Sequence, residues 1–179
     1  ALEMYTDLLS KNQKVGFIAT GQIGITILGE GIPLDAFKLD YACGAVEQII
    51  MKKADKEILL IEGQGSLLHP GSSATLPLMR GSCPTHLILC LRADKKTLRN
   101  PKNIKIPDLN KFIELNESLV SVFGIYPNAK VIGICANTSM LREEQAKNYL
   151  EVLSNKTGIQ VTDPVRFGVN NISKILLKG

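Results

Sequence analysis

The stretch that decides the fold is EILLIEGQGSLLHPG, residues 57–71. Residues 58–61 are four consecutive apolar side chains, the length and composition of a strand that is buried on both faces. Strands of this kind belong to parallel sheets that helices cover on both sides. The apolar run stops at Glu62, and Gly63 and Gly65 follow it closely. We therefore predict a central parallel strand that ends in a polar, glycine-rich turn.

The rest of the chain alternates between strand patterns and helix patterns. Apolar runs typical of strands lie near 14–19, 86–91, 131–135 and 160–162. Apolar residues at helical spacing lie over 1–11, 109–124, 143–153 and 171–177. Such alternation favours parallel strands joined by helical crossovers. The sequence thus predicts an α/β fold with three layers, in which helices cover both faces of a mostly parallel sheet.

Two segments between these elements carry separate predictions. Pro33 suits the first position of a helix that runs to Lys53, with an apolar face at helical spacing. That face is expected to consist of Phe37, Tyr41, Ala45, Ile49 and Ile50. Residues 69–84 are rich in Gly, Ser and Pro, which favours an irregular binding loop over a long element.

Length and composition are those of one globular domain. The chain has 179 residues, of which 45% are hydrophobic and 21% charged, so a sizeable core is expected. No apolar run approaches the roughly 18 residues that a membrane-spanning helix needs, and no signal segment opens the chain. We predict a single domain over residues 1–179, soluble and cytoplasmic, without a membrane partner.

The net charge of +4 has a local origin. Basic side chains crowd residues 95–111, near Pro101 and Pro107. A nucleic-acid surface would interleave aromatic residues with these charges, and none occurs in the segment before Phe112. We therefore expect a solvated loop between a strand and a helix, and no nucleic-acid partner. The basic residues are Lys95, Lys96, Arg99, Lys102, Lys105 and Lys111.

The four cysteines show no CxxC spacing, which argues against a thiolate metal site. Cys90 and Cys135 lie inside apolar runs that are expected to be buried strands. We therefore predict reduced thiols in the core rather than disulfides.

Polar segments gather where the predicted strands end. In open α/β sheets, ligands bind beyond the carboxyl ends of the strands. The opposite strand ends carry simple charges, such as Lys14, Glu57 and Lys130. This asymmetry predicts a site at the carboxyl edge, composed of residues 20–24, residues 62–66, Arg92, Asn137 and residues 163–166.

The candidate residues at this edge each allow two interpretations. Glu62 could act as a base or hold hydrated Mg²⁺, or it could cap the next turn. His69 could act as an acid or base, or be merely solvated. Arg166 could clamp an anion with its planar guanidinium, or pair with Asp163. Asn137 could read a base or an amide, or cap the segment that follows it.

The known nucleotide-binding motifs are absent from these 179 residues. There is no Gly-x4-Gly-Lys-Ser/Thr phosphate loop, and neither glycine cluster opens into Gly-x-Gly-x-x-Gly. A first helix followed by strand, helix and an apolar strand that ends in an acid nevertheless resembles a P-loop protein just after its phosphate loop. We expect that the chain is a fragment of a longer polypeptide.

Three long motifs carry a family resemblance: FIATGQIGITILGEGIPLDA (17–36), IEGQGSLLHPG (61–71) and VTDPVRFG (161–168). Together with LILCLRA (87–93) and VIGICANTSM (131–140), they closely resemble the carboxyl-terminal P-loop domain of a family of unknown function. Some members are labelled epimerase- or dehydratase-like, and the characterised activity in the family is D-glutamate N-acetylation. The resemblance implies an N-acetyltransferase with acetyl-CoA as donor, a small acidic amino acid as acceptor and an upstream Rossmann-like domain in the same protein.

The resemblance also implies roles for particular residues. Arg166 or Arg80 would hold the acceptor's carboxylates, and His69 or Glu62 would deprotonate its amine. Backbone amides near residues 63–66 would stabilise the oxyanion. The substrate-binding set is Thr20, Gln22, Gly63, Gln64, Gly65, Ser66, Arg80 and Arg166, and the cofactor-binding set is Gly21, Gly24 and Asn137.

A more distant similarity links LLIEGQGSLLHP and VIGICANT to dethiobiotin synthetase. By that analogy Glu62 would serve Mg²⁺ and Asn137 the nucleotide base, as in ATP-dependent carboxylate activation or phosphoryl transfer. A third interpretation is a non-catalytic ligand-binding module. The oligomeric state stays open, a homo-oligomer included.

Overall fold

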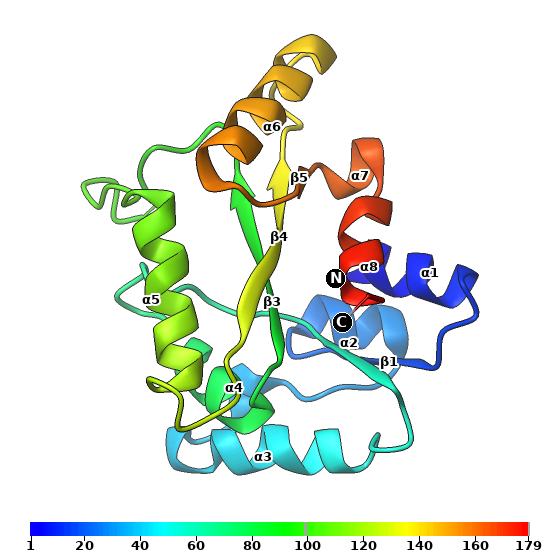
Figure 1. The fold of residues 1–179 in the computed structure, drawn as a ribbon. Coiled ribbons are helices and arrows are strands. Elements are labelled where there is room, and N and C mark those ends of the chain that lie inside the picture. Colours follow the sequence, from blue (N-terminus) through cyan, green and yellow to red (C-terminus); the bar gives the residue numbers. More distant parts are fainter. Residues whose placement is uncertain (99, 179) are drawn as a thin grey trace. The chain divides into compact units, whose positions relative to one another are not determined.

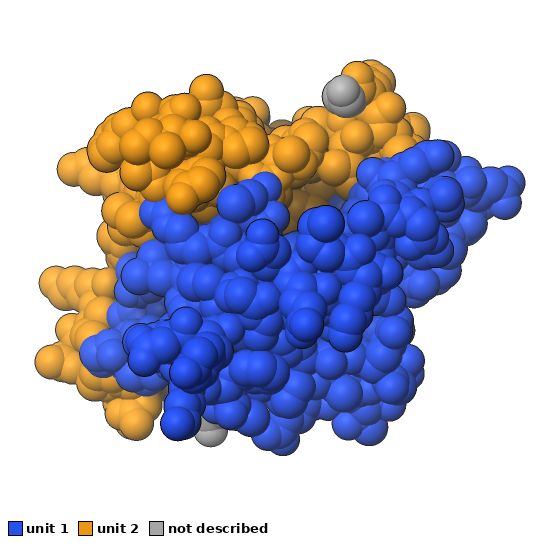
Figure 2. Space-filling view, turned by 90° about the horizontal axis from the view of Figure 1, so that it is seen from below, with its two compact units in different colours: residues 1–83 blue, residues 84–179 orange. Residues whose placement is uncertain are grey.

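Every pairing between strands in the described residues, 1–98 and 100–178, is parallel. The chain, seen here in a computed structural model, forms two compact units of residues 1–83 and 84–179 (Figures 1 and 2). Helices accompany the strands in both units. The predicted α/β class with parallel strands and covering helices is therefore confirmed. That residues 1–179 form one domain stays a prediction, and each unit is described by itself.

The first unit contains a two-stranded parallel sheet. Strand β1 (Val15–Ile18) pairs with β2 (Ile58–Ile61), and the register places Ile18 beside Ile61. All four β1 residues are buried, and the Tyr5 ring lies edge-on to Phe17 at 5.6 Å between ring centroids. Its helices are α1 (Leu2–Ser10), α2 (Gln22–Leu28), the short 3₁₀ helix η1 (Leu34–Ala36), α3 (Leu39–Met51) and α4 (Thr75–Ser82).

The second unit contains a three-stranded parallel sheet in the order β3-β4-β5. A register shift between Leu87 and Ile88 places Val131 and Ile134 in one apolar cluster with Ile113. Gly133 meets Ile172 instead, because a Cβ at position 133 would lie 2.6 Å from that side chain. The elements are β3 (His86–Arg92), α5 (Leu109–Ser121), β4 (Lys130–Asn137), α6 (Glu143–Thr157), β5 (Val161–Thr162), α7 (Pro164–Phe167) and α8 (Asn170–Leu176).

The predicted helix from Pro33 to Lys53 is wrong at its start. Pro33 precedes only the 3₁₀ turn η1, and Phe37 is extended with φ −88° and ψ 144°, so α3 begins at Leu39. The predicted apolar face is also shifted, since Tyr41 is 67% exposed. Helix α3 buries Ala42 and Val46 against Leu34 and Leu78, with Ile50 packed beside them.

One helix lies where no element was predicted, and another lies where a loop was expected. The α2 sequence, QIGITIL, combines β-branched residues with a glycine, a composition that disfavours helix by propensity alone. Helix α4 lies within the Gly/Ser/Pro-rich segment 69–84 that was predicted to be irregular. Its Pro77 is the third helical residue, and a proline in the first turn costs no intrahelical hydrogen bond.

The cysteine prediction is wrong for burial, and the reduced state of the thiols stays a prediction. Cys43, Cys83, Cys90 and Cys135 are all free thiols. Cys90 is exposed and Cys135 is only partly buried, so these two are not core residues. The two residues pair across β3 and β4.

Candidate functional site

Glu62 lies directly after β2, and its carboxylate caps the turn after β1. The backbone N–H groups of Thr20 and Gly21 both donate to Glu62 Oε2 at 3.0 Å. The Thr20 hydroxyl donates to the Glu62 carbonyl at 2.9 Å, and Thr20 is fully buried. The parallel register that pairs Ile18 with Ile61 explains this contact, because it places the two strand ends side by side.

Gly24 lets the Glu62 carboxylate approach helix α2. A Cβ at position 24 would lie 2.5 Å from Glu62 Oε2 and 3.0 Å from the Ala19 side chain. Any larger residue would therefore push the carboxylate away from the N–H groups of Thr20 and Gly21. The predicted cofactor-binding glycines, Gly21 and Gly24, thus contact Glu62 and shape its position.

The second carboxylate oxygen of Glu62 is chemically available. Within residues 1–98 and 100–178, Oε1 accepts no hydrogen bond, and the residue is partly exposed. An ionised carboxylate held by one oxygen can use the other to accept a proton or to bind a hydrated cation. The sequence left open whether Glu62 caps a turn or acts as a base or magnesium ligand. The geometry allows one oxygen to cap the turn while the other stays available as a base or ligand.

The loop after Glu62 is held by side-chain hydroxyls. Gly65 has φ +73°, and a Cβ there would overlap Ser72 Oγ, so glycine is required. Ser72 Oγ accepts from the Ser66 N–H at 3.0 Å and lies 3.2 Å from Thr75 Oγ1. Thr75 in turn donates to the Gln64 carbonyl at 3.2 Å. Ser72 and Thr75 were missed from the sequence, where both belonged to an expected irregular loop.

His69 lies in this loop and is exposed. Its Nδ1 accepts from the Gly71 N–H at 3.1 Å, so the neutral ring carries its proton on Nε2. In that form Nε2 donates a hydrogen bond and does not accept a proton. The loop also buries the Gln64 Oε1 atom without a protein partner among the described residues.

Two further predicted substrate-binding residues lie in the first unit, away from the Glu62 hydrogen bonds. The Gln22 amide donates to Asp35 Oδ2 at 3.3 Å on an exposed surface. Arg80 lies in the last turn of α4 and is partly buried. Neither side chain hydrogen-bonds Glu62 in this arrangement.

Asn137 and Arg166 belong to the second unit. Asn137 Oδ1 accepts from the Ser139 N–H at 3.0 Å, the capping role foreseen as one alternative. The Arg166 guanidinium donates to the Leu141 carbonyl at 2.9 Å and lies 3.5 Å from the Ser139 carbonyl. The expected alternative of a side-chain pair with Asp163 is wrong, because Arg166 contacts the Asp163 carboxylate through its backbone N–H, at 3.3 Å, and not through its guanidinium.

Asp163 is a buried carboxylate, for which the sequence suggested only a pairing with Arg166. It is 4% exposed, and its Oδ2 accepts from the Thr138 N–H at 2.9 Å and from the Thr138 hydroxyl. Its Oδ1 caps α7 by accepting from the N–H groups of Val165 and Arg166. Burial alone raises the pKa of Asp163, but hydrogen bonds from Thr138, Arg166 and Val165 outweigh burial and hold that pKa below its usual value.

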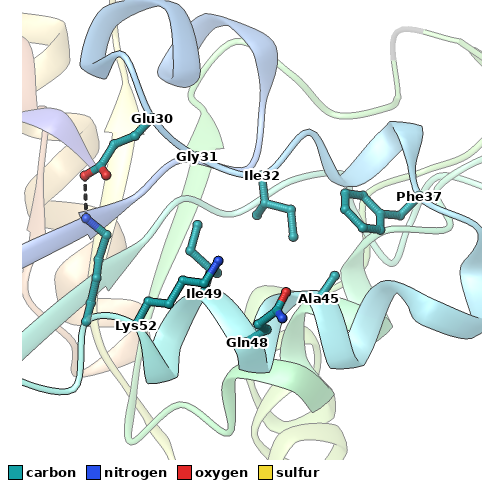
Figure 3. A pocket seen from close by; sticks show the side chains of 9 residues that line it. Glu30, Gly31, Ile32, Phe37, Ala45, Gln48, Ile49 and Lys52 are labelled. Atoms are coloured by element: carbon teal, nitrogen blue, oxygen red, sulfur yellow. Dashed lines mark hydrogen bonds and ion pairs between the residues drawn. The ribbon is translucent and has the colours of Figure 1, made fainter.

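A shallow hollow of about 420 Å³ lies between residues 30–37 and α3 (Figure 3). Ile32, Phe37 and Ile49 supply an apolar lining, and an ion pair joins Glu30 to Lys53 at its rim. None of the predicted site residues lines it.

Two searches of the described residues give negative findings. In the part of the chain that the structure describes, no helix has the length and apolar character to cross a membrane. The same residues hold no group of three or more His, Cys, Asp or Glu side chains that could bind a metal ion.

Comparison with known proteins identifies the family. A family model described as "Domain of unknown function (DUF1611_C) P-loop domain" matches residues 1–173. The chain belongs to this family. A crystal structure of a DUF1611 family protein from Anabaena variabilis superposes with a TM-score of 0.96 and 42% sequence identity. That superposition covers 99% of this chain and 52% of the other.

Two similar proteins carry the name D-glutamate N-acetyltransferase. The one from Tritonibacter scottomollicae is 35% identical over 173 residues, which cover 96% of this chain and 51% of the relative. The one from Pseudoalteromonas sp is 36% identical over 177 residues, which cover 95% of this chain and 53% of the relative. The chain thus spans about half the length of the curated relatives it matches.

Proposed function

We propose that this chain takes part in the N-acetylation of an acidic amino acid such as D-glutamate, with acetyl-CoA as the donor. The observation that carries the proposal is the 35–36% identity to two proteins of that name across nearly the whole chain. Because the relatives are about twice as long, a second domain, Rossmann-like and upstream, belongs to the proposal as well. A cytoplasmic location also remains part of it.

Acetyl transfer needs a base for the acceptor amine. An ammonium group must lose a proton before its lone pair attacks the thioester carbonyl, and the tetrahedral intermediate then expels a thiolate that takes up a proton. The free Oε1 of Glu62 can serve as the base, since Oε2 is already held by the N–H groups of Thr20 and Gly21. His69 fits the role of a hydrogen-bond donor to the substrate or to the leaving thiolate better than the role of base, because its Nδ1 already accepts a hydrogen bond.

The developing oxyanion needs N–H donors that are not already used. The Ser66 N–H donates to Ser72 Oγ and is therefore taken. Among residues 1–98 and 100–178, the N–H groups of Gln64 and Gly65 meet no protein acceptor. We assign the oxyanion to these two amides, and the acceptor's side-chain carboxylate to Arg80, which lies in the same unit.

A second candidate is ATP- and Mg²⁺-dependent carboxylate activation or phosphoryl transfer. The family's description as a P-loop domain favours it, and so does the free oxygen of Glu62. Magnesium is commonly held by one or two carboxylates together with water and phosphate oxygens, so Glu62 fits a magnesium ligand. Asn137 would contact the base through its amide nitrogen, since its oxygen is occupied by Ser139.

One experiment separates these candidates from a non-catalytic binding module. The melting temperature of the full-length natural protein is measured with acetyl-CoA, with D-glutamate and with ATP·Mg²⁺, because any ligand of the native state raises it. We expect shifts with the first two and formation of N-acetyl-D-glutamate without ATP. Product that requires ATP would support the second candidate, and binding without turnover would support the module.

A further inference from the structure

The positive charge of the chain is concentrated in one short segment. Residues 92–111 hold seven of the 21 basic residues and two of the 17 acidic ones. That segment therefore carries +5 and the remaining residues together carry −1, which accounts for the net charge of +4. A charge density of this kind raises the local concentration of anions.

The segment forms a hollow of its own within the second unit. Arg92, at the end of β3, lines a depression of about 300 Å³ together with Lys95, Lys102, Thr97 and Leu98. We call these five residues the basic hollow. Three of its five residues are cations, and one of the others carries a hydroxyl. A lining with three cations suits an anionic ligand better than a neutral one.

Backbone bonds hold the loop around the basic hollow in shape. Thr97 forms an antiparallel bridge with Lys105, and the Leu98 N–H donates to the Ile104 carbonyl at 2.9 Å. The Ile106 N–H donates to the Lys96 carbonyl at 3.0 Å. Lys102 therefore lies in a segment that backbone hydrogen bonds close on both sides, and less conformational entropy is lost when it binds a ligand.

Asp94 holds two of the cations together. Its carboxylate accepts from Arg92 Nε and Nη2 at 3.1 and 3.3 Å and pairs with Lys95 Nζ at 2.7 Å. Hydrogen bonds from Lys95 and Arg92 lower the pKa of Asp94 to about 2, so it stays ionised at neutral pH. Even with this one acid, the three cations leave a surplus of two positive charges at the basic hollow. Lys102 pairs with no acid among the described residues.

We propose that the basic hollow binds the phosphate groups of a small phosphorylated ligand. A planar guanidinium and two ammonium groups match phosphate oxygens in geometry and charge, and Thr97 can donate a further hydrogen bond. Two sources share this chemistry: the nucleotide end of coenzyme A, and ATP. The assignment to coenzyme A rests on the proposed function, whereas the phosphate site itself does not.

Binding is tested on the full-length protein with two probes, adenosine 3′,5′-bisphosphate and ATP, by titration calorimetry. Lys102→Gln removes one charge from the basic hollow, and Lys111→Gln is the matched control, because Lys111 lies in the same basic segment but outside the hollow. We expect Lys102→Gln to weaken one probe about tenfold, and Lys111→Gln to change the dissociation constant less than about twofold. The probe that Lys102→Gln weakens identifies the source.

Equal weakening by Lys102→Gln and Lys111→Gln would overturn the proposal, since it would reflect net charge alone. An unchanged affinity for both probes in Lys102→Gln would overturn it too. The outcome is independent of the proposed function. A phosphate site without any acetyl transfer leaves this inference standing, and acetyl transfer with an unaffected Lys102→Gln variant removes this inference alone.

Discussion

Glu62 and Asp163 are carboxylates that each follow a strand, one in each unit. They differ in how many of their oxygens accept hydrogen bonds and in how exposed they are. Each follows a strand and accepts N–H groups from the segment after a neighbouring strand: Thr20 and Gly21 for Glu62, Thr138 for Asp163. Asp163 is buried, and its second oxygen also accepts hydrogen bonds from N–H groups of α7. Glu62 keeps its second oxygen free at a partly exposed position. Similar placement therefore yields a structural acid in one unit and a candidate base in the other.

The sharpest test of this contrast is Glu62→Gln. The amide oxygen can still accept from Thr20 and Gly21, so we expect little change in the free energy of unfolding. Loss of the charge should lower activity about 10²-fold or more, as for a positioned acid–base group. Steady-state kinetics and a denaturation curve measure both. The control is Glu57→Gln, which removes an exposed charge at the other end of β2; equal activity in both variants would return Glu62 to a capping role.

Asp163→Asn should lower the stability of the fold and leave the activity nearly unchanged, the reverse of Glu62→Gln. Its amide cannot accept from both Thr138 donors and the α7 N–H groups together, and each unsatisfied buried donor costs about 1–3 kcal/mol. We expect a loss of about 2–4 kcal/mol in unfolding free energy, with activity per folded molecule nearly retained.

The stability lost in Asp163→Asn should also depend on pH. The folded pKa of Asp163 lies below its ordinary value, so its stabilising contribution is complete above the unfolded pKa of about 3.9 and is lost as the pH falls through the folded pKa. The stability difference between wild type and Asp163→Asn should therefore be largest near neutrality and shrink below about pH 4. A difference that does not change with pH contradicts the assignment of an ionised Asp163.

Ser72→Ala tests whether the loop after Glu62 needs its hydroxyl support. Without Ser72 Oγ, the Ser66 N–H loses its acceptor and residues 64–66 gain freedom. We expect kcat to fall about tenfold with a smaller change in KM, since positioning of the amides matters most in the transition state. Ser73→Ala is the matched control, because Ser73 is the exposed neighbour in the same loop. Equal kcat values in the two variants would contradict the positioning role.

Arg166→Lys is expected to have the smallest effect. The guanidinium donates a hydrogen bond to the Leu141 carbonyl at 2.9 Å. A lysine should therefore lower the free energy of unfolding by about 0.5–1.5 kcal/mol and leave the Michaelis constants of both substrates unchanged. A selective rise in KM for the acidic substrate would instead show that Arg166 clamps its carboxylate. Kinetics with each substrate varied in turn, together with a melting curve, decides this.

The sequence predicted the strands well because their signal is local. Residues 58–61 form a continuous apolar run, and buried parallel strands need such runs. The positions of Glu62 and of Thr20 after their strands followed from the same pattern. Which atoms meet depends on register, however, and no local pattern encodes the pairing of Ile18 with Ile61.

The parts that were missed depend on long-range contacts. Helix α2 forms from residues with weak helical preference, and its buried residue is Gly24, which contacts Glu62 from a distant part of the sequence. The bonds between Asp163 and Thr138 span 25 residues. Ser72 matters only because Gly65 turns back toward it. Such positions are set by tertiary structure, and the local sequence pattern does not encode them.

The two N–H groups on Glu62 Oε2 make the candidate base observable in solution. An amide proton that is hydrogen-bonded to a carboxylate changes its chemical shift when that carboxylate gains a proton or binds a cation. The Thr20 and Gly21 resonances in an amide correlation spectrum should therefore follow the charge state of Glu62 directly. Titrating the protein with acid, with Mg²⁺ or with an amino acid would then read the chemistry at this one side chain from the backbone, without any turnover assay.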